Sequence, residues 1–426
     1  MNKNNDNKIK LTFHPAEFGA KMPIPLAEQS VKAGFPSPAQ DYMEGEIDLN
    51  DILVRHREAT FYVRISGDSM QDAGILDGDL AVVDRQIEPS NGNFVIAFVD
   101  GEFTIKQFKM DESGTFGWLI PWNKNFSPIR VDETNQLIYF SANGVQAKED
   151  PYLIRYYRIG FDGKNLTCLT PTEGMHNAWF SKDMQYLVDV YSMVDKAPVA
   201  VLRDAKNGKV IMPLETADIS RLEAEGWKAP EVFTAKGRDG KTDMWGIIIR
   251  PSNFDPDKKY PVLEYIYQGP GNQYVPKTFI PYNYFMSGIA ELGFIVVMVD
   301  GMGTSFRSRT FENVCYKNLK DAGLPDHIAW IKSAAQKYPY MDIDRVGIYG
   351  CSAGGQESMT AVLFHPEFYK AAYSACGCHD NRMDKIWWNE QWLGYPVGEQ
   401  YKEGSNVENA HLLSRPLMLV VGEMDD

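Results

Sequence analysis

The sequence has few cysteines, no long apolar run and no excess of positive charge. Its five cysteines lie at irregular spacings that form no disulfide framework, so reduced thiols and a cytoplasmic location are expected. No stretch reaches the length of about 18 apolar residues that a membrane span needs, and the polar start MNKNNDNKIK lacks the apolar core of a signal peptide. A net charge of −14 argues against direct nucleic-acid binding, which requires a basic face.

One cysteine pattern has the spacing of a metal-ligand pair. Cys376 and Cys378 form a C-x-C pair, which could bind a metal ion. Two small residues buried near a strand end are the favoured interpretation of this pair. No metal and no cofactor are therefore expected.

The hydrophobic pattern changes three times along the chain. A loose arm rich in Pro, Gly and Lys is followed by short alternating strands, then by strands with a different rhythm, then by alternating strands and helices. These changes predict an arm over 1–40, an all-β domain over 41–134, a partial β-propeller over 135–228 and an α/β domain with a mostly parallel sheet over 229–426.

The third region predicts two propeller-type blade units. Hairpin turns are expected at the segments FDGK, 161–164, and KNGK, 206–209. A propeller closes with about 4–8 blades, so two blades form only a remnant of one. Its uncapped edges and apolar faces favour aggregation.

A serine and a lysine in the all-β region suggest the first chemical site. Ser69 lies just after a strand in SGDSMQDAGILDGD, and Lys106 lies within the strand pattern FTIKQF. The pKa of a lysine held among apolar neighbours falls, and the neutral amine can then take the proton of a serine hydroxyl. A lysine in a strand more often faces solvent, so the pair alone is a weak signal.

The region around this pair, about 25–133, resembles the UmuD/LexA-like self-cleaving serine peptidases of the SOS response to DNA damage. The resemblance rests on GFPSPAQDYMEGEIDLNDILVRHREATFYVRISGDSMQDAGILDGDLAVVDR and GNFVIAFVDGEFTIKQF. It implies a LexA-like all-β peptidase fold, with Ser69 as nucleophile, Lys106 as general base and self-cleavage between Ala33 and Gly34. It also implies a dimer of the chain with itself, and the RecA filament and a Y-family polymerase as partners. The similarity stops near Thr134, before the closing strands of that fold.

The motif GCSAG predicts a second serine site. Its glycines and Ser352 lie between a strand pattern and a helix pattern, which is the arrangement of a nucleophile elbow. The backbone N–H of Ala353 is then placed to hold an oxyanion. The acid of such a triad follows a later strand, and LMLVVGEMDD supplies Asp425, with Asp426 as the less favoured choice.

No histidine occupies the loop that would normally deliver the base of this triad. The fold orders its triad as serine, acid, histidine along the chain. All seven histidines precede the acid: His14, His56, His176, His327, His365, His379 and His411. The second site is therefore expected to lack a base and to be inactive.

The second part of the chain, about 136–426, resembles the prolyl oligopeptidase family in its dipeptidyl peptidase IV-like branch. The resemblance rests on PVLEYIYQGP, FIVVMVDGMGTSFRSR, DRVGIYGCSAGG and HDNRMDKIWWNEQWLGYP. It implies that Tyr267 helps to hold the oxyanion and that Trp387 and Trp388 line the pocket for the residue before the cut; plain core packing of this pair is the alternative. Most of the propeller, the catalytic histidine and the final helix of that family are expected to be missing.

The sequence is thus interpreted as a chimera of two serine peptidases joined near residue 134. Self-cleavage by Ser69 and Lys106 is the favoured activity. Hydrolysis of prolyl or dipeptidyl peptide substrates through Ser352 is one alternative. A non-catalytic adaptor that binds a polymerase or RecA is the other.

Overall fold

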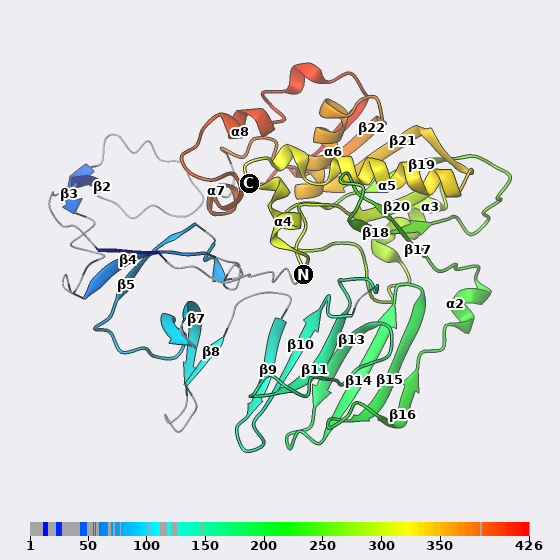
Figure 1. Ribbon diagram of the computed structural model, residues 1–426. Coiled ribbons are helices and arrows are strands. Elements are labelled where there is room, and N and C mark those ends of the chain that lie inside the picture. Colours follow the sequence, from blue (N-terminus) through cyan, green and yellow to red (C-terminus); the bar gives the residue numbers. More distant parts are fainter. Residues whose placement is uncertain are drawn as a thin grey trace, which may run out of the picture. The chain divides into compact units, whose positions relative to one another are not determined.

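The chain divides into two compact units in a computed structural model, Met1–Ser127 and Pro128–Asp426 (Figure 1). The structure describes residues 12–15, 23–27, 43–48, 54, 56, 59–66, 70, 73–76, 78–99, 102–110, 117–120, 126–146, 148–383 and 386–425. None of the helices in these ranges combines the length and the apolar content that crossing a bilayer requires.

The described part of the first unit consists of short strands in small antiparallel sheets. The strand orders are β1-β4-β5, β2-β3 and β6-β7-β8. A small core of Ile65, Met70 and Ile105 holds the second half of this unit together. The LexA-like arrangement of these sheets stays a prediction. The strands are β1 (Thr12–Pro15), β2 (Pro23–Ala27), β3 (Met43–Asp48), β4 (Thr60–Arg64), β5 (Leu80–Asp84), β6 (Phe94–Val99), β7 (Glu102–Met110) and β8 (Gly117–Ile120).

Two four-stranded sheets begin the second unit, with the strand orders β12-β11-β10-β9 and β13-β14-β15-β16 (Figure 1). Both expected hairpins form: β11 pairs with β12 around Gly163, and β15 pairs with β16 around Gly208. Both glycines have a positive φ, which the tight turns require. The strands are β9 (Phe126–Asp132), β10 (Leu137–Asn143), β11 (Ile154–Gly160), β12 (Thr167–Cys168), β13 (Met175–Phe180), β14 (Tyr186–Met193), β15 (Lys196–Asp204) and β16 (Val210–Thr216).

Strand β9 marks the junction of the two parts. The motif NFSPIRVDET, residues 125–134, predicts that these residues belong to the self-cleaving peptidase domain, which is expected to end at residue 134. In the structure, β9 is instead the outer strand of the first four-stranded sheet. The boundary between the compact units accordingly lies at 127/128.

A buried polar cluster ties the strands of the second sheet together. Asp189 is 0% exposed and accepts hydrogen bonds from His176 Nδ1 at 2.8 Å and from Arg203 Nε at 2.7 Å. Arg203 also donates to the Thr172 hydroxyl at 2.8 Å. Because each buried charge has a partner, the cluster joins β13, β14 and β15 without leaving an isolated ion in the core.

The remainder of the second unit is an α/β layer around a seven-stranded sheet in the order β17-β18-β20-β19-β21-β22-β23. Strands β17 and β18 are antiparallel to their neighbours, and the other pairs are parallel, which confirms the mostly parallel sheet. The strands are β17 (Glu231–Lys236), β18 (Asp243–Ile249), β19 (Tyr260–Tyr265), β20 (Ile295–Asp300), β21 (Met341–Cys351), β22 (Tyr369–Ala375) and β23 (Leu417–Val420).

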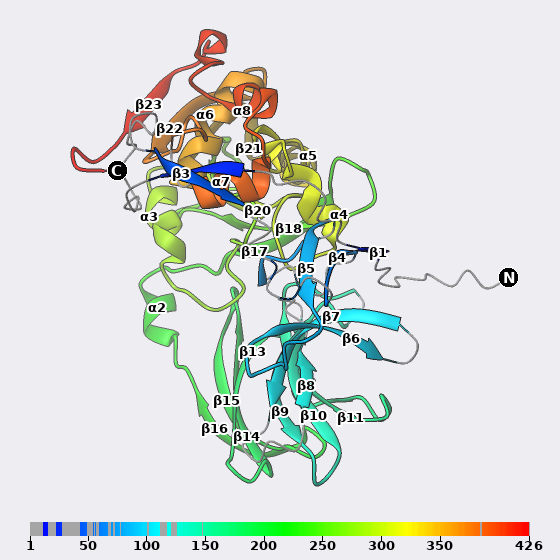
Figure 2. The same ribbon diagram turned by 90° about the vertical axis from the view of Figure 1, so that its left-hand side faces the viewer.

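Helices cover both faces of this sheet. The residues of β20 alternate: Ile295 and Val297 join the core cluster that contains Trp330 of α5, whereas Val296 and Met298 join the cluster that contains Met286 of α3. Helix α6 lies against β21 and β22 (Figure 2). The helices are α2 (Ser220–Ala224), η3 (Asn283–Phe285), α3 (Met286–Ala290), α4 (Arg309–Glu312), η4 (Asn313–Cys315), η5 (Leu319–Asp321), α5 (Leu324–Lys337), α6 (Ala353–Phe364), α7 (Ile386–Leu393), α8 (Glu399–Gly404) and η6 (Ala410–Leu412).

Buried polar contacts join the four-stranded sheets to the α/β layer. Lys277 Nζ donates to Asp150 at 2.8 Å, and both side chains are almost fully buried. The same ammonium lies 4.7 Å from the centre of the Tyr152 ring, and the Arg307 guanidinium lies 5.7 Å from it. Asn143 donates to the carbonyl of Phe306 at 3.0 Å. The two parts of the second unit are therefore held together by ion-pair, cation–π and hydrogen-bond contacts.

Candidate functional site

The nucleophile elbow forms where β21 ends and α6 begins. Ser352 is exposed and has φ 59° and ψ −122°, a conformation that costs about 1–3 kcal/mol for a residue other than glycine. Its N–H donates to the carbonyl of Ala375 at 2.9 Å, and its carbonyl accepts from the N–H of Gln356 at 3.0 Å. These bonds to β22 and α6 hold the strained turn in place.

Three glycines allow the backbone of the elbow to pack closely. A Cβ on Gly350 would lie 2.5 Å from the carbonyl oxygen of Ile266, and one on Gly354 would lie 2.0 Å from the same atom. A Cβ on Gly355 would lie 2.2 Å from the carbonyl oxygen of Ala375. The end of β19 and the end of β22 therefore press directly on the elbow, and only glycine fits at the contact points.

Tyr267 follows the end of β19 and is half-buried, with its ring 4.7 Å from the ring of Tyr274. The loop that carries Tyr274 is fixed by Asp300, which accepts the N–H groups of Tyr274 at 2.8 Å and of Val275 at 3.1 Å. Burial, together with the neighbouring Tyr267, raises the pKa of Tyr274, so this ring stays neutral beside Tyr267. Tyr267 and Ala353 thus lie on the two segments that meet at Gly354, while their role in holding an oxyanion stays a prediction.

Asp425 follows β23 and is exposed, and its N–H donates to the carbonyl of Gly422 at 3.1 Å. The thiol of Cys376 donates a hydrogen bond to the Asp425 carboxylate, which raises the pKa of Cys376. Cys376 directly follows Ala375, whose carbonyl accepts the N–H of Ser352. The structure therefore brings Ser352 and Asp425 to the same end of the sheet, whereas Asp426 lies outside the described residues.

The histidines whose side chains the structure describes contact groups other than Ser352. His379 is half-buried, with Nε2 3.4 Å from the Ser374 hydroxyl oxygen and Nδ1 3.2 Å from Asn406 Nδ2. His411 is exposed and contacts the carbonyl of Glu408. The other four, His56, His176, His327 and His365, contact Asp84, Asp189, Glu264 and Glu367 respectively.

The tryptophans of α7 lie on the helix next to a small core. The side chain of Trp387 lies outside the described residues. Trp388 is half-buried against a core that contains Leu319, Trp392 and Leu393. Trp392, which sequence reasoning missed, lies one helical turn after Trp388 on the same helix face, and the spacing of four residues in WNEQW could have indicated it. Whether Trp387 and Trp388 line a substrate pocket stays a prediction.

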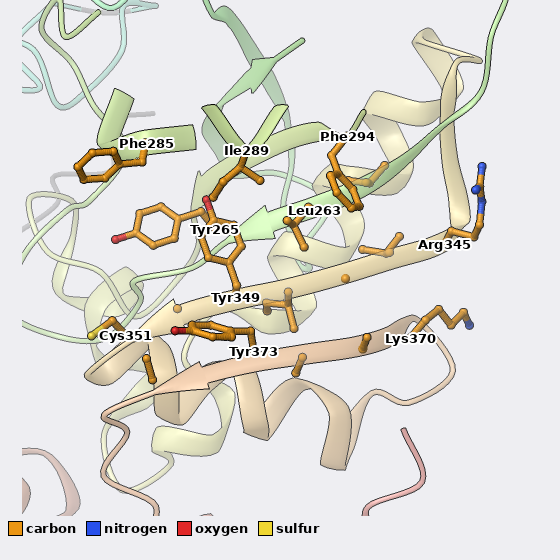
Figure 3. A pocket seen from close by; sticks show the side chains of 18 residues that line it. Leu263, Tyr265, Phe285, Ile289, Phe294, Arg345, Tyr349, Cys351, Lys370 and Tyr373 are labelled. Carbon is orange, nitrogen blue, oxygen red and sulfur yellow. The ribbon is translucent and has the colours of Figure 1, made fainter. Parts of the chain in front are cut away.

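An apolar cavity of about 920 Å³ lies beside the elbow, on the face of β19, β21 and β22 that α3 borders. Figure 3 shows Cys351 and Tyr373 toward one end of it and Arg345 and Lys370 toward the other. Tyr349 lies between them, and burial raises its pKa. The cavity wall therefore begins at the residue that precedes Ser352.

The first serine site is described only in part. Ser69, Ala33 and Gly34 lie outside the described residues. Lys106 lies on β7, is half-buried, and donates from Nζ to the Thr104 hydroxyl and to the carbonyl of Ile105, both at 2.9 Å. In the ranges that the structure describes, no group of three or more His, Cys, Asp and Glu residues could hold a metal ion.

A strained serine turn between a strand and a helix of a mostly parallel sheet is the arrangement of a nucleophile elbow. Comparison with protein families shows which families the parts of the chain resemble. Residues 25–142 match the family described as Peptidase S24-like, residues 108–198 match the dipeptidyl peptidase IV N-terminal region, and residues 282–426 match the prolyl oligopeptidase family. The chain therefore combines parts of two peptidase families, and both resemblances read from its motifs are confirmed. The first two matches overlap over 108–142, the segment that contains β9.

Individual proteins agree with these family matches. The chain is 26% identical over 290 residues to dipeptidyl peptidase 8 of Homo sapiens, covering 65% of this chain and 31% of that protein. The identity to dipeptidyl peptidase 8 of Mus musculus is 26% over 286 residues. Among solved structures, dipeptidyl peptidase 4 of Porphyromonas gingivalis superposes with a TM-score of 0.62 at 23% identity, covering 85% of this chain and 52% of that one. The chain thus spans about a third of the length of the curated relatives it matches, and the structural likeness shows the fold alone.

Proposed function

We propose that the chain is a serine peptidase whose first activity is cleavage of its own arm between Ala33 and Gly34. The observation that carries this proposal is the small core of the first unit. Met70, which directly follows Ser69, and Ile105, which directly precedes Lys106, are buried in one cluster, 1% and 5% exposed. The backbone next to Ser69 and the backbone next to Lys106 therefore adjoin one core, which supports the pairing that the resemblance implies.

The reaction that follows is an acyl transfer. A neutral Lys106 amine takes the proton of the Ser69 hydroxyl as its oxygen attacks the carbonyl of Ala33. The C–N bond to Gly34 breaks, the leaving amine takes the proton from Lys106, and water then releases the acyl group from Ser69. We infer from the family resemblance that this cut occurs in the cytoplasm and serves the SOS response.

Incubation of the purified chain at alkaline pH tests this activity, because a larger fraction of the lysine is then neutral. The expected product is a fragment that begins at Gly34, identified by N-terminal sequencing or mass spectrometry. Ser69→Ala and Lys106→Ala should each abolish it, while Ser352→Ala should leave it unchanged. A chain that stays intact through prolonged incubation would contradict the proposal.

The second candidate function is hydrolysis of peptide substrates by Ser352. The strained elbow and its glycine contacts favour it, and the names of the similar proteins suggest release of dipeptides from substrate termini. We infer that residues 1–426 perform this reaction poorly, because the histidines described in the structure contact other groups than Ser352. Without a base, only binding and the oxyanion contacts contribute to catalysis, roughly 10³–10⁴-fold over water.

Hydrolysis of Gly-Pro and Ala-Pro chromogenic peptides measures this second activity. We expect no useful turnover, and the same low rate for Ser352→Ala. Rapid hydrolysis that disappears in Ser352→Ala would show that a base reaches the elbow.

The partners are inferred from the resemblance of residues 25–133. A first unit that binds a second copy, the RecA filament or a Y-family polymerase would act as an adaptor whether or not it cuts. Pull-down of each partner with the Ser69→Ala chain separates the two roles, because binding that survives this substitution does not depend on cleavage.

A further inference from the structure

A network of buried polar side chains lies beneath the end of β19; its members are Glu264, His327, Gln268 and Tyr369. Glu264 is 0% exposed; His327 Nδ1 lies within hydrogen-bond distance of its carboxyl group, which also accepts a hydrogen bond from the Tyr369 hydroxyl at 2.8 Å. The other ring nitrogen of His327, Nε2, lies 3.1 Å from Gln268 Oε1. His327 is 1% exposed and Gln268 is also 1% exposed. Such groups destabilise a core unless each donor faces an acceptor, so their donor and acceptor roles can be worked out.

The amide of Gln268 has one satisfactory orientation. Its Nε2 donates to the carbonyls of Gly301 and Met302, both at 3.2 Å, and its Oε1 accepts the N–H of Gly301 at 3.3 Å. Turning the amide over would point its oxygen at two carbonyl oxygens and its NH₂ group at an N–H. Gln268 Oε1 is therefore the atom that faces His327 Nε2.

Both ring nitrogens of His327 thus face oxygen acceptors. With Glu264 ionised, a neutral imidazole has one N–H and could satisfy only one of them, whereas an imidazolium donates from both nitrogens. We propose that His327 is doubly protonated and positively charged and is paired with the Glu264 carboxylate. This charged network then positions Tyr267 and the Ser352 elbow. His327 is a positioning residue in this role, since it acts through Gln268.

The segment from Glu264 to Gln268 connects the charged network to the Ser352 elbow. Glu264 and Gln268 both contact the His327 ring. Ile266 and Tyr267 lie between these two residues in the sequence, so their backbone is held at both ends. The carbonyl oxygen of Ile266 is the atom that presses on Gly350 and Gly354. A shift of this segment therefore moves the oxyanion tyrosine and the elbow together.

The other charged groups next to this network are paired with one another. Asp326, one residue before His327 on α5, accepts the N–H of Met302 at 3.0 Å and pairs with Arg238 at 2.9 Å. The loop at Met302 is therefore held by Gln268 on one side and by Asp326 on the other. Burial raises the pKa of Tyr369, so its hydroxyl remains a donor to Glu264. Glu264 is then the one carboxylate in direct contact with the His327 ring among the described residues.

The charge of His327 can be measured by ¹⁵N NMR on the full chain labelled at histidine, at pH 7, with His327→Gln to assign the signals. The expected result is a pair of one-bond N–H signals from the His327 ring, one for each nitrogen. A single N–H signal together with a bare ring nitrogen would overturn the charged state. This measurement does not depend on any activity of Ser352.

The positioning role rests on the proposed nucleophilic character of Ser352. Its readout is the slow covalent labelling of that serine by an excess of fluorophosphonate, which the exposed elbow and its oxyanion contacts support without a base. His327→Gln should lower the labelling rate roughly 10- to 100-fold, the cost of displacing a reacting group by about 1 Å. His365 is half-buried and is not part of the network of Glu264, His327 and Gln268. His365→Gln is therefore the matched control and should label at the wild-type rate.

The double variant Glu264→Gln/His327→Gln keeps the test decisive if the single variant unfolds, because it leaves no unpaired charge in the core. We expect the double variant to fold and to label slowly. Labelling of the folded double variant at the wild-type rate would overturn the positioning role. Failure of the wild-type chain to label at all would instead refute Ser352 as a nucleophile, while the NMR result on His327 would stand.

Discussion

At the scale of single residues, the second unit uses its histidines for structure. His176 and His327 are buried with carboxylate partners, and His379 is half-buried between Ser374 and Asn406. A histidine enclosed in this way cannot serve the exposed Ser352 hydroxyl, but it makes the fold sensitive to pH. The direction of this sensitivity depends on which effect is larger: burial, which favours the neutral ring, or a carboxylate partner, which favours the charged ring.

His379 should lower the stability of the fold as the pH falls. Burial lowers the pKa of His379, so the folded chain binds fewer protons than the unfolded chain, whose histidine titrates near its ordinary value of about 6.5. The stabilisation by neutral His379 is therefore complete above that value and is lost as the pH falls through it. His379→Gln should flatten the pH dependence of the unfolding free energy between pH 7 and about pH 5. Urea unfolding at several pH values measures this, with the exposed His411→Gln as control, and an unchanged slope in His379→Gln would refute it.

At the scale of elements, the site depends on how closely three strand ends approach one helix. The ends of β19 and β22 contact the turn between β21 and α6 through Gly350, Gly354 and Gly355. Helix α6 is buried over nearly its whole length, so it cannot move away to relieve an added side chain. Packing at the elbow is therefore set by backbone contacts rather than by adjustable side chains.

Gly354→Ala should disrupt this junction. The added Cβ would lie 2.0 Å from the Ile266 carbonyl oxygen, so the strand end or the helix must shift, at a cost of about 1–3 kcal/mol or more. Gly288→Ala in α3 is the matched control, because no atom lies within 4 Å of its Cβ position and alanine favours helix by about 1 kcal/mol over glycine. Urea unfolding should show a loss of stability for the first variant and none for the second. Equal stabilities for the two variants would contradict a close contact at Gly354.

The sequence predicted elements whose signals are local and missed contacts between distant residues. The strand, serine turn and helix around Ser352 and the hairpin at Gly208 follow from adjacent residues, so their patterns could be read directly. The pair of Glu264 and His327 is separated by 63 residues, and its formation depends on where β19 and α5 meet. The motif of β9 resembled the self-cleaving family and did not reveal that this strand pairs with β10.

At the scale of the whole molecule, net charge opposes the tendency of exposed apolar strands to associate. Strand β16 is the outer strand of its sheet and is exposed along its length, with Ile211 50% and Met212 49% exposed. Pro213 within it lacks an N–H group, which weakens direct strand pairing and leaves apolar contact as the main attraction. The net charge of −14 produces repulsion between copies at neutral pH.

Association of the chain should therefore rise with salt. The Debye length falls from roughly 10 Å at 0.1 M salt to about 3 Å at 1 M, so the repulsion is screened while apolar attraction remains. Sedimentation velocity should show a larger average mass at high salt, and also near the isoelectric pH of about 5.1, where the net charge vanishes.

Ile211→Gln should reduce this association because it removes apolar area from β16 without changing the charge. Val407→Gln, which removes a side chain 59% exposed outside that strand, is the control. If added salt instead dissociates the chain, charge attraction rather than apolar contact would hold the copies together, and β16 would not be the surface through which they meet.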